Sequence, residues 1–212
     1  VSNDSVTHEL FIHKGLWNGS NDVTWAVNKR ITPSYDLSSN GTPVVADYTM
    51  NIAFDPTGQK GWISLATEIN PTGSNVAVPL FYKTTDGGAT WQGPISLNLN
   101  YFDGVRNAMD PAGSQIPTLT FEGGMAVDKD GDPHMLVSVG SVGTTDYSIQ
   151  NANTMTMFDF YHASGGGSDI WYALNLGEVK ALRGSYGTSP IQQDNRPQVT
   201  TSTNGDKMFF TG

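Results

Sequence analysis

Cysteine is absent from this chain of 212 residues, and charged residues make up only 15% of it, against roughly 25% in an average soluble domain. Without cysteine the chain cannot carry out thiol catalysis, ligate zinc through sulfur or hold an iron–sulfur cluster. Long apolar runs are absent too, because no stretch approaches the roughly 20 residues that span a bilayer. We therefore expect no membrane span and no cysteine-dependent cofactor.

Basic residues are also few. Eleven Lys and Arg stand against 20 Asp and Glu, which gives a net charge of -9. An acidic surface repels phosphate backbones, so we expect no nucleic-acid partner. The sequence lacks the His-Glu-x-x-His, Gly-x-Ser-x-Gly and phosphate-loop patterns, and we expect no metal and no cofactor.

Turn-forming residues are what the chain has in quantity, with 24 Gly, 11 Pro and many Ser, Thr and Asn. This composition favours short strands joined by turns over helices. Aromatic residues reach 10%, which argues against disorder. The composition therefore predicts an all-β fold.

Three hairpin patterns recur at a nearly constant interval. Each is a strand, a polar turn and a second, apolar strand, and the turn glycines are Gly58, Gly131 and Gly205, evenly spaced to within a single position. Glycine supplies the positive φ that such turns need. A fixed period indicates a solenoid, a propeller or an array, and this interval fits a four-stranded propeller blade with long loops.

The second strand of each hairpin is almost continuously apolar, which predicts burial on both faces, as between stacked sheets. These strands are 62–66, 135–139 and 208–210. The remaining strands are expected at 9–12, 23–31, 76–83, 95–100, 169–176 and 179–184.

We predict a β-propeller of four-stranded antiparallel blades, present as a partial propeller of about two and a half blades. Residues 1–46 would end one blade, 47–118 and 119–190 would form two more, and 191–212 would begin a fourth. Because such a piece exposes apolar edges, we expect the rest of its own propeller or another chain to cover them. A twisted sandwich with a chance repeat is the alternative.

The sharpest local motif runs from Tyr82 to Trp91. Asp86 can accept hydrogen bonds from backbone N–H groups of the turn, and the two glycines that follow it permit a tight turn. Thr90 can bond back to the turn, and Trp91 can bury its ring beneath it.

This run resembles the Asp-box, or bacterial neuraminidase repeat, of sialidase-like propellers, with the pattern Ser/Thr-x-Asp-x-Gly-x-Thr-Trp. The matching residues are Thr84, Asp86, Gly88, Thr90 and Trp91. The resemblance implies a structural element between the third and fourth strands of a blade, away from any catalytic side. Residues 13–25 look like an eroded copy that keeps Thr24 and Trp25. The acidic, cysteine-free composition of the chain also resembles that of exported propeller proteins of Bacteroidetes-type bacteria.

Sialidases share an arginine trio that grips the substrate carboxylate, and other glycosidases need two carboxylates flanking a bond. The chain has four arginines, Arg30, Arg106, Arg183 and Arg196, of which Arg196 only loosely echoes the sialidase context. Carboxylates that could contribute to a glycosidase site are Asp47, Glu68, Asp103, Asp110, Glu122 and Asp159. We expect most of them to be solvated loop residues.

Three other patterns are weaker. The run from Asp128 to Asp132 looks like the start of a calcium loop, but position 12 is Val139 where Glu is needed, so a hairpin turn is favoured. The histidines, His8, His13, His134 and His162, form no metal-ligand spacing. Aromatic residues that could stack on sugars, but for which core packing is favoured, are Trp17, Trp62, Trp171, Tyr161 and Tyr172.

An Asp-box is a folding element found in enzymes and in non-catalytic adhesins, so it does not fix the activity. The function we favour is a secreted or cell-surface bacterial propeller module that binds glycan or protein without catalysis of its own. One alternative is a sialidase-like glycoside hydrolase whose catalytic residues lie partly outside the chain. Another is an exported cargo within a secretion or surface assembly.

Overall fold

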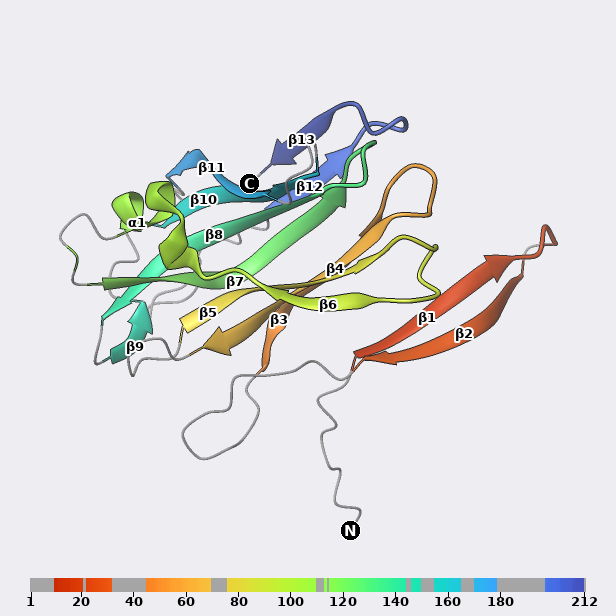
Figure 1. Cartoon of the computed structure of the whole chain (residues 1–212), viewed down its shortest axis with the longest axis horizontal. Coiled ribbons are helices and arrows are strands. Elements are labelled where there is room, and N and C mark those ends of the chain that lie inside the picture. The colour runs from red at the N-terminus through yellow and green to blue at the C-terminus, as the bar shows by residue number, and fades with distance from the viewer. Residues whose placement is uncertain are drawn as a thin grey trace, which may run out of the picture.

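A computed structural model describes residues 10–20, 22–31, 45–69, 76–109, 113, 115–143, 146–149, 155–164, 170–178 and 197–211. These residues form a mostly β protein with antiparallel sheets laid side by side (Figure 1). We number the sheets in chain order.

Sheet 1 is a hairpin of β1 (Leu10–Trp17) and β2 (Val23–Ile31). Sheet 2 is a four-stranded meander of β3 (Val45–Phe54), β4 (Gly61–Ile69), β5 (Val76–Thr84) and β6 (Gln92–Ser96). Sheet 3 has the order β7 (Gln115–Val127), β8 (Pro133–Gly143), β10 (Thr156–Ala163) and β11 (Ile170–Glu178), with β9 (Asp146–Ile149) paired to β8. Sheet 4 is a hairpin of β12 (Gln198–Thr201) and β13 (Met208–Thr211). A turn of 3-10 helix, η1 (Leu99–Tyr101), and α1 (Asp103–Met109) connect sheets 2 and 3.

The three hairpins predicted from the repeat are confirmed. They are β3–β4, β7–β8 and β12–β13. Their turn glycines have the positive φ that a Cβ would disfavour, at 68° for Gly58, 86° for Gly131 and 71° for Gly205.

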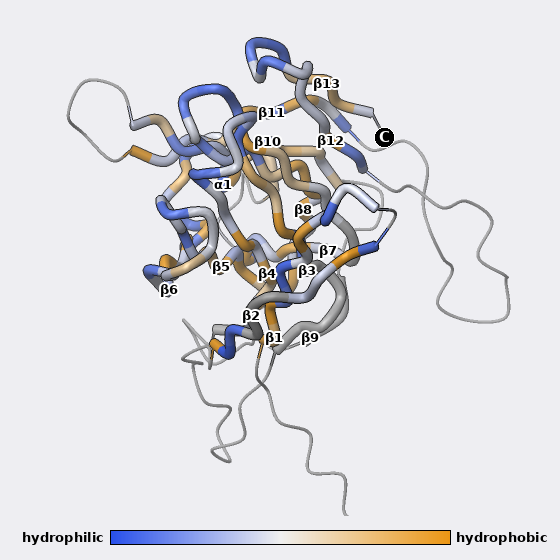
Figure 2. The backbone as a smooth tube through the Cα atoms, turned by 90° about the vertical axis from the view of Figure 1, so that its right-hand side faces the viewer, coloured by the Kyte–Doolittle hydropathy of each residue, from blue (hydrophilic) through white to orange (hydrophobic). Residues whose placement is uncertain are grey.

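Burial on both faces is confirmed for β4 and β8. Trp62 and Ile63 are adjacent in β4 and point to opposite faces, yet both are buried. Trp62 belongs to the core between sheets 2 and 3, whereas Ile63 belongs to a smaller core against sheet 1. Figure 2 shows the matching apolar band along these central strands. For 208–210 the prediction is wrong, because Phe209 is 54% exposed and Phe210 is 38% exposed.

Neighbouring sheets are also joined by hydrogen bonds to main-chain carbonyls. Lys14 Nζ of sheet 1 donates to Gly87 O of sheet 2 at 3.0 Å. Trp62 Nε1 of sheet 2 donates to Gly131 O of sheet 3 at 2.9 Å, and Lys129 N of sheet 3 donates to Gly205 O of sheet 4 at 3.1 Å. The sheets therefore stack in chain order, 1 to 4.

Two expected strands differ from the structure, and two elements were not predicted. The third strand of sheet 3 is β10, which the sequence did not predict, so the strand expected at 169–176 is the fourth strand, β11. The strand expected at 95–100 covers Gln92–Ser96 instead, and η1 follows it because Asn98 accepts a bond from Asn100 N. The helix α1 was not predicted either. The strand expected at 179–184 lies outside the described residues.

Candidate functional site

The first strands of three successive hairpins lie side by side. β7 packs against β3 on one side and against β12 on the other. Asn51, Gly124 and Gln198 occupy the same place in these strands, each seven residues before the turn glycine of its hairpin. The repeat thus brings one position from three sheets into a single row.

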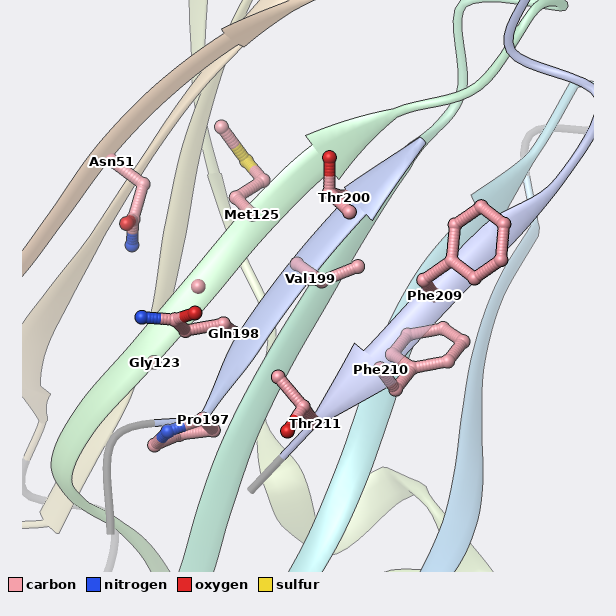
Figure 3. Close-up of a pocket in the computed structure, with 11 residues that line it drawn as sticks. Asn51, Gly123, Met125, Pro197, Gln198, Val199, Thr200, Phe209, Phe210 and Thr211 are labelled. Atoms are coloured by element: carbon pink, nitrogen blue, oxygen red, sulfur yellow. The ribbon is translucent and has the colours of Figure 1, made fainter. Parts of the chain in front are cut away.

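A hollow of about 650 Å³ opens at this row. In Figure 3 the Gln198 side chain extends from β12 across β7, in the direction of the strand that carries Asn51. The remaining lining comes from β7 and from both strands of sheet 4: Gly123, Gly124, Met125, Pro197, Val199, Thr200, Phe209, Phe210 and Thr211.

The lining combines three kinds of chemistry. Asn51 and Gln198 offer amide donors and acceptors, and Thr200 and Thr211 offer hydroxyls. Phe209 and Phe210 add flat apolar rings, and Phe209 is more than half exposed. Amides, hydroxyls and aromatic rings are suited to an uncharged, polyhydroxylated ligand.

Gly124 sets how closely β12 approaches β7. A Cβ at this position would lie 3.2 Å from both Pro197 O and Val199 N, which is tighter than ordinary contact. The absence of a side chain therefore lets the two backbones meet, and it leaves the floor of the hollow open between Asn51 and Gln198.

The turn between β5 and β6 contains the residues that resemble an Asp-box. Asp86 Oδ1 accepts from Thr84 Oγ1 at 2.8 Å and from Thr90 N at 2.8 Å, and Asp86 Oδ2 accepts from Thr90 Oγ1 at 2.6 Å. Gly88 N donates to Thr84 Oγ1 at 3.0 Å. The main backbone donor to Asp86 is thus Thr90 N, four residues on, and the Ala89 backbone N–H, three residues on, also lowers the pKa of Asp86. Trp91 is partly buried and packs beside Ile63 and Leu65.

These bonds lower the pKa of Asp86 from 3.8 to about 2. The Thr90 hydroxyl is the largest cause, followed by the Thr90 backbone N–H and the Thr84 hydroxyl. All three donate to the ionised form and so favour it. The Asp86 carboxylate therefore orders its own turn in sheet 2. It does not line the hollow, to which Gln198 of sheet 4 contributes.

Two histidine–aspartate pairs lie in sheet 3. His162 Nδ1 lies 2.7 Å from Asp132 Oδ1, and Ser164 donates to Asp132 Oδ2 from its backbone N at 3.0 Å and its hydroxyl at 2.9 Å. Burial disfavours the charged form of Asp132, yet the hydrogen bonds from Ser164 and His162 lower its pKa overall. This pair fixes the turn of β7–β8 against the end of β10.

The second pair faces sheet 4. His134 Nδ1 lies 2.7 Å from Asp159 Oδ2, while Asp159 Oδ1 is buried with no hydrogen-bond partner among the described residues. Asp159 is only 2% exposed, so it is an exception to the expectation that most of the candidate carboxylates are solvated loop residues. It projects from β10 between Leu136 of β8 and Leu174 of β11.

The structure does not bring the other predicted site residues together among the residues that it describes. Arg30 lies over the Phe11 ring at 5.0 Å, and Arg106 pairs with Asp103 within α1 at 2.6 Å. These two arginines are in different parts of the stack. The remaining predictions concern positions or side chains outside the described set: Arg183, Arg196, Asp47, Glu68, Asp110, Glu122 and His8.

The hairpin turn that the sequence favours over a calcium loop at Asp128 to Asp132 is present in the structure. Asp128 Oδ1 accepts from Asp130 N and Asp132 N, both at 2.9 Å, and so closes the turn itself. Among the described residues no cluster of metal-ligating side chains occurs, and no helix there is long and apolar enough to cross a membrane.

The aromatic residues divide between core and surface. Trp62 is buried, and Trp171 packs against it and against Phe81. Trp17 is 65% exposed, so the preference for core packing is wrong there. Tyr172 is 42% exposed and stacks on Tyr161 across β10 and β11.

Sequence reasoning missed the hollow at the first strands. The sequence does contain a sign of the hollow, because Asn51, Gly124 and Gln198 stand at the same position of the repeat. That shared position predicts a single row of residues only once the sheets are known to stack in chain order. Comparisons with known proteins give no significant match to a family model, a curated protein or a solved structure.

Proposed function

We propose that the chain is a β-propeller module, secreted or displayed on a bacterial surface, that binds glycan at the hollow between β7 and sheet 4 without catalysis of its own. The observation that carries this proposal is the row of Asn51, Gly124 and Gln198, one from each of three consecutive first strands.

The propeller part rests on how the sheets repeat. In sheet 2 and in sheet 3 the four main strands run in chain order as an antiparallel meander, as in a propeller blade. Each sheet meets the next with the same face. Trp62, the second residue of β4, points to sheet 3, and His134, the second residue of β8, points to Phe210 of sheet 4. This repeat supports the proposal, because the blades of a propeller are four-stranded sheets that succeed one another around a central channel.

The glycan part rests on the lining. Sugars present hydroxyls, which pair with amides and threonine hydroxyls, and apolar C–H faces, which fit aromatic rings. Catalysis of glycoside cleavage needs two carboxylates beside the bond. Among the described lining residues none is a carboxylate or an arginine, which favours binding over hydrolysis.

The test is a glycan array followed by titration calorimetry on the best glycan. We expect Gln198→Ala and Asn51→Ala each to weaken binding about tenfold, since each removes hydrogen bonds worth roughly 1–2 kcal/mol to the ligand. Gln92→Ala is the matched control, because Gln92 is an exposed amide on β6 that does not line the hollow. Turnover of any glycoside in a fluorogenic panel would overturn the non-catalytic part of the proposal. An affinity that neither Gln198→Ala nor Asn51→Ala changes would show that the glycan binds elsewhere.

A further inference from the structure

We infer that Asn18 is a site of self-modification, at which the backbone nitrogen of Gly19 attacks the Asn18 side-chain amide and converts the asparagine to aspartate and isoaspartate. The inference is carried by an activated side-chain carbonyl beside a backbone N–H that has no acceptor among the described residues. It depends neither on the propeller nor on the ligand of the proposed function.

The site is an open turn. Asn18 lies at the tip of the β1–β2 hairpin, which projects from one end of the molecule in Figure 1. Asn18, Gly19 and Ser20 are all exposed. Gly19 has a φ of 78°, and a Cβ there would meet no atom within 4 Å. Water therefore reaches the reacting atoms, and the turn has room for ring closure.

The side-chain carbonyl of Asn18 is already polarised. Asn18 Oδ1 accepts a hydrogen bond from Ser20 N at 2.8 Å. When a nucleophile adds to Asn18 Cγ, this oxygen gains negative charge, and a backbone N–H that already points at it stabilises that charge. The turn thus supplies a donor for the transition state before the reaction begins.

The attacking nitrogen is that of Gly19. Among the described residues Gly19 N donates to no acceptor, whereas Asn18 N donates to Asp22 O at 3.1 Å. No hydrogen bond to those residues has to break before Gly19 N loses its proton to solvent. Glycine also has no side chain that would shield the nitrogen on its way to Asn18 Cγ.

The reaction needs water and no other co-reactant. Gly19 N gives its proton to solvent and forms a bond to Asn18 Cγ, and the Cγ–Nδ2 bond then breaks, so that the side-chain nitrogen leaves as ammonia. Water next opens the cyclic imide at one of its two carbonyl carbons. Breaking the bond from Gly19 N to Cγ gives aspartate. Breaking the bond from Gly19 N to the main-chain carbonyl carbon of Asn18 gives isoaspartate, in which the backbone runs through the former side chain.

The chain contains a matched dipeptide that the fold holds in place. Asn204 Oδ1 accepts from Ser202 Oγ at 2.8 Å, so its carbonyl is polarised as well. Gly205 N, however, donates to Ser202 O at 2.8 Å. Gly205 is buried against sheet 3, where its O accepts from Lys129 N at 3.1 Å. Because the attacking nitrogen there must first give up a bond, we expect Asn204 to react more slowly than Asn18.

Conversion changes the hairpin in two ways. Both products place a new negative charge in the turn that contains Asp22. Isoaspartate also lengthens the backbone by one carbon between Trp17 and Val23, which are paired across the two strands. The length of a hairpin loop fixes its register, so the longer turn no longer matches this pairing. We expect faster amide exchange at the paired ends of β1 and β2.

The test follows each Asn-Gly pair in one sample of the 212-residue chain. The folded protein is incubated at mildly alkaline pH, and peptide mapping by mass spectrometry, with chromatographic separation of isoaspartate, gives a rate at each position. We expect Asn18 to convert at least about tenfold faster than Asn204, because the cost of one hydrogen bond at Gly205 corresponds to about that factor. Asn40, which also precedes a glycine and lies outside the described residues, is mapped separately.

The same incubation in urea is the matched control, because unfolding breaks the hydrogen bond of Gly205 and exposes both dipeptides to water. The rates at Asn18 and Asn204 should then become similar. Gly19→Ala is a second control. A Cβ on residue 19 crowds the attacking nitrogen, so conversion at Asn18 should slow severalfold while conversion at Asn204 stays unchanged.

Equal rates at Asn18 and Asn204 in the folded chain overturn the inference, as does an Asn18 that stays intact while the chain in urea converts. A difference that persists in urea overturns it too, since the cause would then lie in the neighbouring sequence and not in the fold.

The effect on the hairpin is tested against Asn18→Asp, which supplies the new charge without the added carbon. Protein that contains isoaspartate at position 18, separated by ion exchange, should show faster amide exchange than this variant at the paired ends of β1 and β2. Equal exchange in the two proteins would overturn the effect on register.

Discussion

Asp86 and Asp132 are carboxylates that the fold uses to order backbone, and both have a pKa below the ordinary value. Asp86 holds an exposed turn in sheet 2, and Asp132 joins the buried His162 to the backbone of Ser164. The sequence indicated the first role from the residue pattern alone. It could not indicate the second, because Asp132 and His162 are 30 residues apart and meet only once β8 and β10 pair.

The low pKa of Asp86 predicts an acid-sensitive turn. A carboxyl whose pKa is lowered on folding stabilises the fold above its unfolded pKa of about 3.9, and that stabilisation is lost as the pH falls toward about 2. The melting temperature of Asp86→Asn should therefore fall less than that of wild type between pH 4 and pH 2. The comparison is made by circular dichroism, and Asp103→Asn should retain the wild-type slope; equal slopes for Asp86→Asn and wild type would contradict the prediction.

Asp132→Ala should lower the free energy of unfolding by about 2–4 kcal/mol, since it removes the partner of Nδ1 in the buried His162 and the acceptor of Ser164 N. The measurement is urea unfolding at pH 7. Asp130→Ala is the matched control, because Asp130 is an exposed residue of the same turn paired with Lys129, and its loss should cost under about 1 kcal/mol. Similar losses for both variants would show that the buried network contributes little.

At the scale of elements, the pattern of turn glycines and apolar strands was enough to predict three hairpins and the burial of β4 and β8. It was not enough for β10, because no glycine turn marks the start of Thr156–Ala163 and its length is compatible with a loop. The short helix α1 was missed because seven residues between two sheets give too little periodicity. The hollow was missed because it forms by lateral packing of strands that are distant from one another in the sequence.

Trp62 is a large buried side chain among those that join sheets 2 and 3. Trp62→Ala removes a ring in contact with Phe81 and Trp171 and leaves Gly131 O without its donor. We expect a loss of about 3–5 kcal/mol in the free energy of unfolding. Trp17→Ala, which truncates a largely exposed tryptophan, should cost less than about 1 kcal/mol in the same urea titration. A small loss for Trp62→Ala would show that the two sheets do not depend on this contact.

Gly124 governs the approach of β12 to β7. Gly124→Ala should push the strands apart, since its Cβ would meet Pro197 O and Val199 N at 3.2 Å. Amide exchange of Val199 and Thr200 should become faster, with a stability loss of about 1–3 kcal/mol. Gly104→Ala is the control, because a Cβ there meets nothing within 4 Å and lies in α1, where alanine is favoured. Unchanged exchange in Gly124→Ala would mean that β12 does not rest on β7 as described.

At the scale of the whole molecule, most of the exposed large apolar side chains belong to sheets 1 and 4 and to β11, toward the two ends of the stack. Exposed apolar side chains that gather at the ends of a stack mark the faces on which a further sheet or a partner would pack.

The bonds between neighbouring sheets have a consequence for how such repeats diverge. Lys14, Trp62 and Lys129 each donate to the carbonyl of a residue in the following sheet, and a carbonyl is present whatever the side chain. A substitution of the accepting residue therefore does not remove the acceptor of the bond. The accepting side of each junction can therefore change its side chains and keep its bond, whereas the donating side depends on Lys14 and Trp62 at two of the three junctions.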